Sequence, residues 1–231
     1  MPISKGFYKK VYPWLIAEDS KDVLYRPFLT KGNPYKSRIF LVSSHAVPLF
    51  KVEDRSEQIF AESLVNRELF HDLYLSEIKG APREFKGSLQ FENWLENNHH
   101  ESLIYTSLNT YQLESADEAK VAKKEDTANF ERGNLIFKEV VEEFQPEIII
   151  LQGTAAYEQF KARYADRLAI FNEDVTKVQL LEQTGPFAEM VYEDGKKVAI
   201  FVTRSMSYFG ADGSKFEQFK ENLAKILENN A

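Results

Sequence analysis

The residues best suited to chemistry in this sequence stand at the end of a short apolar run. Four β-forming residues, Ile39–Val42, are followed directly by two hydroxyls and an imidazole, those of Ser43, Ser44 and His45. Such a run, bounded by turn residues, is typical of a buried strand in a parallel sheet. Ligands in open α/β sheets bind just beyond the carboxyl ends of such strands. We therefore expect a ligand site here.

Polar side chains also follow two later predicted strands, at residues 103–106 and 197–203. Those that carry a hydrogen-bonding or charged group are Ser107, Asn109, Arg204, Ser205 and Ser207.

Other chemical motifs are weak or missing. His99 and His100 are adjacent on a polar turn, where neighbouring side chains point apart, and no second ligand pair has zinc-like spacing. The segment around Gly153 passes from a strand to a helix but lacks the glycine patterns of dinucleotide and nucleotide sites. No G-x-S-x-G elbow supports a small-molecule hydrolase acting through Ser43 or Ser44. We expect neither a metal nor a cofactor.

Length and composition favour one large α/β domain over residues 1–231. The chain is 43% hydrophobic and carries no cysteine, which excludes disulfide and thiolate chemistry and fits a cytoplasmic protein. No segment is long and apolar enough to suggest a membrane span or signal peptide, so no membrane association is expected. The net charge of −7 argues against strong non-specific binding of nucleic acid.

The first 37 residues nevertheless form a basic, aromatic-rich arm. Lysines alternate there with phenylalanines, tyrosines and a tryptophan, and Lys36 and Arg38 follow closely on its last turn. Such a mixture suits a phosphate backbone beside stacked bases, with Lys36 and Arg38 on phosphates. The alternative is an arm that packs its aromatic rings on the core and leaves its lysines in solvent.

Periodicity and turn residues predict an alternation of helices and strands. The predicted helices are 55–76, 89–97, one or two within 116–144, 155–164 with Thr154 as N-cap, and 215–228 capped by Ser214. The predicted strands are 39–42, 103–106, 148–151, 187–192 and 197–203, the last two joined by a hairpin at Asp194-Gly195. This order predicts a three-layer α/β/α sandwich with a largely parallel central sheet.

Five segments carry a resemblance to a known family. They are RPFLTKGNPYKSRIFLVSSHAVPL from Arg26, NRELF (66–70), SLIYTSLNTY (102–111), PEIIILQGTAAYEQF (146–160) and KVAIFVTRSMSYFG (197–210). Their order resembles the uracil-DNA glycosylase superfamily over residues 26 to about 225. The resemblance implies that family's fold and the excision of a base flipped out of DNA.

All three motifs of that family are altered in this chain. The resemblance puts His45 at the water-activating position and Ser205 where the family has the histidine that stabilises the departing base anion, with Ser207 retained after it. It places Ser107 where an asparagine is expected and Asn109 two residues later. The neighbouring Arg204 would supply positive charge for the anion and is predicted, with Lys36 and Arg38, to contact phosphate. Phe50, Phe60 or Phe70 would stack on the base, with Ser43, Ser44, Ser107 and Asn109 as base contacts.

Three functions remain open at this stage. The first is a glycosylase-like protein that binds a nucleobase in single- or double-stranded DNA, with excision weak, altered or lost. The second is an active N-glycosylase on a different modified base, with His45 as the base catalyst. The third is a non-enzymatic scaffold that binds a protein partner. For Phe60 and Phe70, a place in the core is the alternative to stacking on a base.

Overall fold

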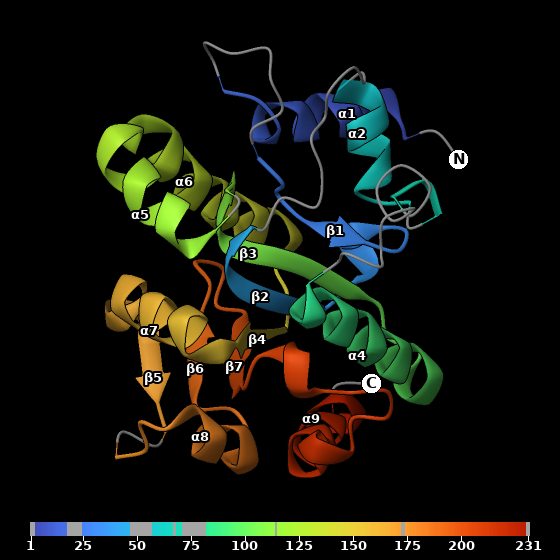
Figure 1. The fold of residues 1–231 in the computed structure, drawn as a ribbon. Helices are drawn as coiled ribbons and strands as arrows, with labels where there is room; N and C mark the ends of the chain where they lie inside the picture. The colour runs from blue at the N-terminus through green and yellow to red at the C-terminus, as the bar shows by residue number, and fades with distance from the viewer. Residues whose placement is uncertain are drawn as a thin grey trace. The chain divides into compact units, whose positions relative to one another are not determined.

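The computed structural model describes residues 3–17, 25–46, 57–66, 68–70, 82–113, 115–171 and 174–229. These residues form two compact units (Figure 1). The first unit comprises Met1–Lys36, His45–Ala81 and Ile104–Phe144. The second unit comprises Ser37–Ser44, Pro82–Leu103 and Gln145–Ala231.

The second unit is built on strands in the order β2, β4, β7, β6, β5. The strands are β2 (Ile39–Ala46, in this unit up to Ser44), β4 (Ile148–Gln152), β7 (Lys197–Thr203), β6 (Ala188–Val191) and β5 (Leu168–Ile170). The first three run parallel and the last two antiparallel to their neighbours. Ile150 pairs with Leu41 on one side and Phe201 on the other, and all three are fully buried. The α/β class with a mostly parallel centre is thus confirmed.

Four helices belong to this second unit within its described residues. They are α4 (Arg83–His99), α7 (Gly153–Arg163), α8 (Val178–Thr184) and α9 (Glu217–Asn229). Helix α7 packs beside β4, and α8 packs beside β7 and α9 (Figure 1). Three single-turn 3₁₀ helices complete it: η4 (Ala165–Arg167), η5 (Met206–Tyr208) and η6 (Ser214–Phe216).

The first unit pairs the short strand β1 (Leu29–Thr30) antiparallel with β3 (Leu103–Gln112). Its helical elements are α1 (Lys5–Val11), η1 (Tyr12–Trp14), η2 (Pro34–Lys36), α2 (Glu57–Ser63), α5 (Ala116–Glu125) and α6 (Thr127–Phe144). Helices α5 and α6 lie side by side (Figure 1). No helix in the described ranges is long and apolar enough to cross a membrane.

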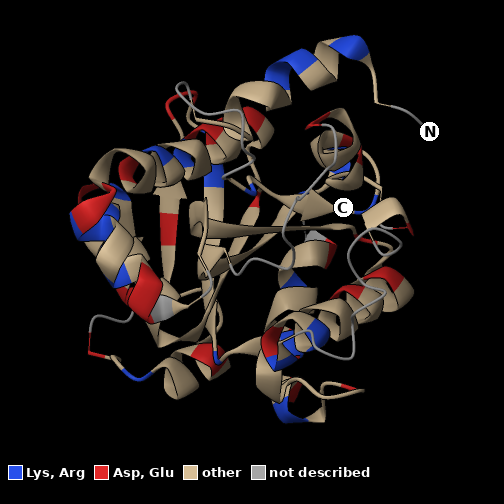
Figure 2. Ribbon diagram, turned by 45° about the horizontal axis from the view of Figure 1, so that its top comes forward, with Lys and Arg blue, Asp and Glu red and all other residues tan. Residues whose placement is uncertain are grey.

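Aromatic residues of the N-terminal arm pack into the core of the first unit. Trp14 and Phe28 both contact Phe144 edge-on, with ring centroids 6.1 and 5.2 Å away, and Trp14 donates a hydrogen bond to Glu139. The lysines of α1 are exposed, and Figure 2 shows them as blue segments near the N-terminus. The packing of aromatic rings predicted as the alternative for this arm is therefore present, and Lys10 is ion-paired with Glu143.

Several predicted elements have different limits. The helix predicted at 89–97 begins at Arg83. Gly87, which was expected to lie in the break before this helix, is one of its residues. The strands predicted at 39–42 and 103–106 continue to Ala46 and Gln112, so His45, Ser107 and Asn109 lie within strands. Of the helix predicted at 55–76, residues 57–63 form α2, and residues 71–76 lie outside the described ranges.

Two predicted caps are wrong. Helix α7 starts at Gly153, with Gln152 and not Thr154 at its N-cap position. Ser214 opens the 3₁₀ turn η6 and does not cap α9, which begins at Glu217. The sequence also gave no indication of α1, β5 or α8, which are short. In contrast, the hairpin at Asp194-Gly195 is confirmed, and the one or two helices predicted within 116–144 are two.

Gly87 lets α4 approach the backbone of η5 more closely than any other residue could. A Cβ atom at position 87 would lie 1.7 Å from the carbonyl oxygen of Met206. We expect Gly87→Ala to lower the free energy of unfolding by about 1–3 kcal/mol, the usual cost of overpacking. Urea unfolding measures the change.

Gly6→Ala is the matched control, because nothing lies within 4 Å of a Cβ atom at that exposed helical position. This control should be neutral or raise the free energy of unfolding by up to about 1 kcal/mol through helix propensity. Equal stability of Gly87→Ala and Gly6→Ala would contradict the close contact between α4 and η5.

Candidate functional site

The strongest candidate site lies at the carboxyl ends of the parallel strands of the second unit. Strand β4 ends at Gln152 and β7 at Thr203, which are paired in register. Strand β2 carries Ser43, which is buried, and Ser44, which is partly exposed. The loop after β7 supplies Ser205 and the residues of η5. This edge is where ligands bind in open α/β sheets, and we call it the strand-end site.

A carboxyl group and two hydroxyls form a hydrogen-bonded chain at this edge. The Ser205 hydroxyl lies 2.7 Å from Glu84 Oε2 and 3.0 Å from the Ser207 hydroxyl. The Ser205 oxygen also accepts a hydrogen bond from the Ser207 backbone N–H at 3.2 Å. These contacts bring together both serines that the sequence predicted for the last loop, and they add Glu84.

The direction of donation in this chain depends on the protonation state of Glu84. A hydroxyl has a single proton to donate. When Glu84 is ionised, Ser205 donates to it and Ser207 donates to Ser205. When Glu84 is protonated, it donates to Ser205, which then donates to Ser207. The arrangement can therefore pass a proton between the carboxyl group and the Ser207 hydroxyl.

Burial raises the pKa of Glu84 above its ordinary value, although the hydrogen bond from Ser205 acts in the opposite direction. Glu84 lies in the first turn of α4, where the helix dipole also favours the ionised form. The loss of hydration outweighs both effects. A carboxyl group with a raised pKa at a strand end is suited to general acid or base catalysis.

Gly87 determines how Glu84 reaches this loop. Residues 84 and 87 are three apart and therefore lie on the same side of α4. The close approach of Gly87 to Met206 brings that side of the helix against η5. The Met206 backbone N–H in turn donates to Gln152 Oε1 at 3.3 Å, which ties the loop to the end of β4.

Two buried polar atoms beside this loop have no hydrogen-bond partner in the described residues. They are Gln152 Nε2 and Thr203 Oγ1, on residues that are 3% and 0% exposed. An unsatisfied buried donor or acceptor costs about 1–3 kcal/mol. The two residues are paired in register on the neighbouring parallel strands β4 and β7. They are therefore candidates to bind a polar ligand or an ordered water.

Arg204, predicted to contact phosphate, is engaged within the second unit. Its guanidinium lies 2.8 Å from Glu182 Oε1, donates to the Lys215 carbonyl and stacks over the Phe216 ring at 4.9 Å. Its backbone N–H also donates to Glu182, which is 4% exposed. Arg204 thus neutralises a buried carboxylate and anchors the start of the loop after β7.

The other predicted phosphate contacts differ in their surroundings. Arg38 is ion-paired with Glu101 and Glu147 at 2.5 and 3.4 Å and donates to the Leu227 carbonyl. Lys36 is exposed. The Arg38 guanidinium therefore holds together the ends of several elements of the second unit, and its phosphate role stays a prediction, as does that of Lys36.

The remaining predicted site residues belong to the first unit. Asn109 donates to the Phe130 carbonyl and to Asn134, and its Oδ1 accepts from the Tyr111 N–H, so its amide joins β3 to α6. Ser107 is buried in β3. His45 is partly exposed, and burial lowers its pKa, so its imidazole is neutral at pH 7.

The aromatic side chains proposed to stack on a base are accounted for in part. Phe60 and Phe70 are fully buried, which confirms the core as their location. Phe50 lies outside the described residues. No group of three histidines or carboxylates in the described ranges is arranged to hold a metal ion.

The raised pKa of Glu84 predicts a pH signature in stability. The native state holds the Glu84 proton more tightly than the unfolded state, whose pKa is near the ordinary 4.5. The native state is therefore favoured by Glu84 at low pH, and this contribution is lost as pH rises from about 4.5 through the native pKa. Urea unfolding of the wild type and Glu84→Gln across this window measures it.

The wild type should lose stability relative to Glu84→Gln as pH rises through that window. A difference between wild type and Glu84→Gln that stays constant with pH would contradict a raised pKa.

The ion pair between Arg204 and Glu182 predicts a large loss of stability when it is broken. Arg204→Met leaves a buried carboxylate without its partner, and we expect the free energy of unfolding to fall by about 3 kcal/mol or more. Arg132→Met breaks the more exposed pair with Glu139 and should cost about 1 kcal/mol or less. If Arg204→Met and Arg132→Met lower the free energy of unfolding equally in urea, the Glu182 carboxylate does not depend on Arg204 for its stability.

Comparisons with known proteins do not assign a family. No protein-family model matches the chain, and no curated protein shows significant similarity to it. The resemblance to the uracil-DNA glycosylase superfamily therefore remains an expectation based on the order of five segments. The functional argument depends on the residues at the strand-end site themselves.

Proposed function

We propose that this chain binds a nucleobase in DNA at the strand-end site, with base excision that is weak, altered or lost. The observation that carries the proposal is the hydrogen-bonded chain of Glu84, Ser205 and Ser207 at the carboxyl ends of parallel strands. These are the groups with which the strand-end site would transfer a proton to or from a bound base.

Cleavage of an N-glycosidic bond requires a donor for the departing base, because negative charge develops on the base as the bond breaks. The raised pKa of Glu84, which is partly buried, increases the fraction of the carboxyl group that carries a proton at a given pH. Ser207 stands at the far end of the hydroxyl chain and would present that proton to the base. This arrangement uses a carboxyl group and hydroxyls where the resembling family uses a histidine.

Recognition of the base would use the unsatisfied groups of Gln152 and Thr203. The first offers an amide N–H and the second a hydroxyl that can donate or accept. An N–H and a hydroxyl on adjacent strands complement the neighbouring C=O and N–H groups of a lactam edge, as in uracil or hypoxanthine. This complementarity supports a lactam-bearing base as the ligand.

An active N-glycosylase that uses His45 is the second candidate. The observation that favours it is the lowered pKa of His45, since a neutral imidazole can accept a proton from water at pH 7. The two candidates differ in the residue on which cleavage depends. A scaffold that binds a protein partner is what remains if neither binding nor cleavage of DNA is found.

A panel of single-stranded and duplex oligonucleotides tests both candidates. Each carries uracil, hypoxanthine, xanthine or an abasic site, and binding and alkali-revealed strand scission are measured at low salt. For the first candidate we expect binding to a lactam-bearing base, and any cleavage should fall about 100-fold or more in Glu84→Gln. Ser205→Ala should reduce cleavage in the same direction, and Glu96→Gln serves as the control.

The pattern among variants separates the candidates. Cleavage that disappears in His45→Ala but survives in Glu84→Gln would replace the first candidate by the second. Binding that is equal for modified and unmodified oligonucleotides would contradict base recognition at the strand-end site. Absence of both binding and cleavage would overturn both candidates.

A further inference from the structure

The first unit contains a cavity of about 940 Å³ that is separate from the strand-end site. It is lined by α1, by the turn between β1 and η2, and by Val65, Asn66 and Glu68. The apolar part of its wall includes Phe7, Pro34, Tyr35 and Val65. Its volume lies within the range of about 300–1,000 Å³ that is typical of small-molecule sites.

Two asparagines in the cavity wall are oriented by the backbone. Asn33 Oδ1 accepts a hydrogen bond from the Tyr35 N–H at 3.1 Å, and Asn66 Oδ1 accepts one from the Leu69 N–H at 3.1 Å. Because each carbonyl oxygen is already used, each amide is left with its NH₂ group as a donor. Neither NH₂ group has an acceptor in the described residues.

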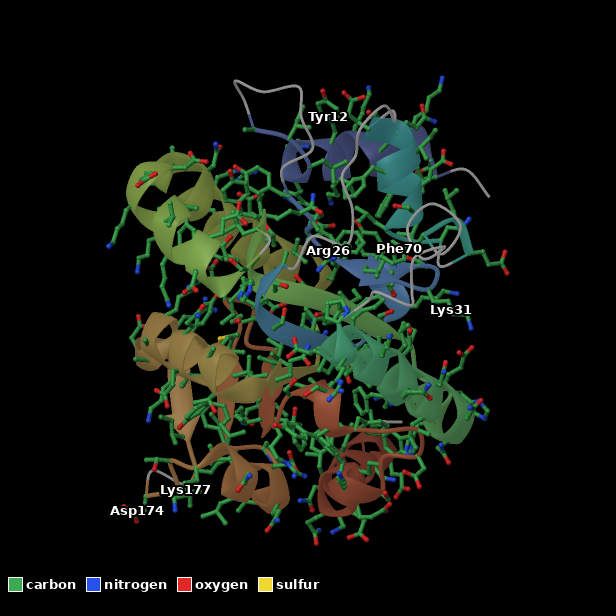
Figure 3. All side chains as sticks on the ribbon, viewed as in Figure 1. Tyr12, Arg26, Lys31, Phe70, Asp174 and Lys177 are labelled. Carbon is green, nitrogen blue, oxygen red and sulfur yellow. The ribbon has the colours of Figure 1, made fainter. Side chains whose placement is uncertain are left out.

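The charged residues of the wall are more basic than acidic. Lys10 and Lys31 line the cavity, with Glu68 as the carboxylate of its described wall. Figure 3 labels Lys31, which lies on the turn directly after β1. Lys10 is ion-paired with Glu143, which also accepts a hydrogen bond from the Tyr35 hydroxyl at 2.7 Å. The hydrogen bond that Lys10 donates to Glu143 raises the pKa of Lys10, which therefore carries its charge at neutral pH.

We propose that this cavity binds a small aromatic anion, a molecule with a flat apolar body and a carboxylate, sulfonate or phosphate group. Phe7, Pro34 and Val65 would pack against the apolar body. The NH₂ groups of Asn33 and Asn66 would donate to the anionic oxygens, beside Lys31 and the Lys10–Glu143 ion pair. A neutral apolar ligand would leave these donors unsatisfied, and the two NH₂ groups offer a cation no acceptor.

Fluorescence titration with 1-anilinonaphthalene-8-sulfonate, an aromatic anion, tests the proposal. We expect saturable binding to one site, and weaker binding of the neutral analogue N-phenyl-1-naphthylamine. Gly6 lines the cavity, and nothing lies within 4 Å of a Cβ atom there, so Gly6→Phe places a ring in the cavity without a backbone clash. This variant should bind the anion at least about tenfold more weakly than the wild type.

A second variant tests the donors without changing the shape of the cavity. Asn33→Asp keeps an oxygen for the Tyr35 N–H but replaces the NH₂ donor by a charged acceptor, and should weaken binding about tenfold or more. Asn97→Asp adds the same charge at an exposed position of α4 and should leave binding unchanged. Circular dichroism and thermal unfolding establish that each variant is folded.

Wild-type affinity in a folded Gly6→Phe would overturn the cavity as the binding site. Equal affinity of Asn33→Asp and Asn97→Asp would overturn the assignment of an anion, as would equal binding of the charged and neutral probes. If Gly6→Phe does not fold, the comparison of the two aspartate variants decides the question. None of these outcomes depends on the function proposed for the strand-end site.

Discussion

The close approach of α4 to the carbonyl of Met206 is the constraint on which the strand-end site depends. It requires the absence of a side chain at Gly87 and fixes one side of the helix against the loop after β7. One turn earlier, Glu84 is then within hydrogen-bond distance of Ser205. The raised pKa of that carboxyl group follows from the same packing, because the packing removes part of its hydration.

Part of the fold and of the site could be predicted because the signals are local. The apolar runs of β4 and β7 are typical of buried strands, and an Asp-Gly pair between two β-forming segments marks a hairpin. Ser205 and Ser207 could be predicted because they follow such a strand. Glu84 was missed because the low helix propensity of Gly87 predicts a break in the chain around it. In the structure both residues lie on α4 and contact the loop about 120 positions later.

The residues whose predicted roles stay untested show a second limit of sequence. Asn109 and Arg204 have the donor groups expected of ligand-binding residues, yet their groups are occupied by α6 and by Glu182. The type of a residue shows which hydrogen bonds its side chain can make, but it does not show which group is its partner. Conversely, no pattern in the sequence predicts a binding role for the Gln152 amide. It becomes a candidate because its Nε2 atom is buried without a hydrogen-bond partner in the described residues.

The outermost strand of the second unit has a consequence for solubility. Strand β5 has three residues, pairs with β6 on one side, and is followed by Phe171, which is 55% exposed. An open strand edge can recruit a strand from another molecule, and short edges limit the number of hydrogen bonds such a recruit can gain. Arg167, directly before β5, adds a charge at that edge and donates to the Val191 carbonyl. Lengthening β5 would therefore favour chain-to-chain aggregation before it improved stability.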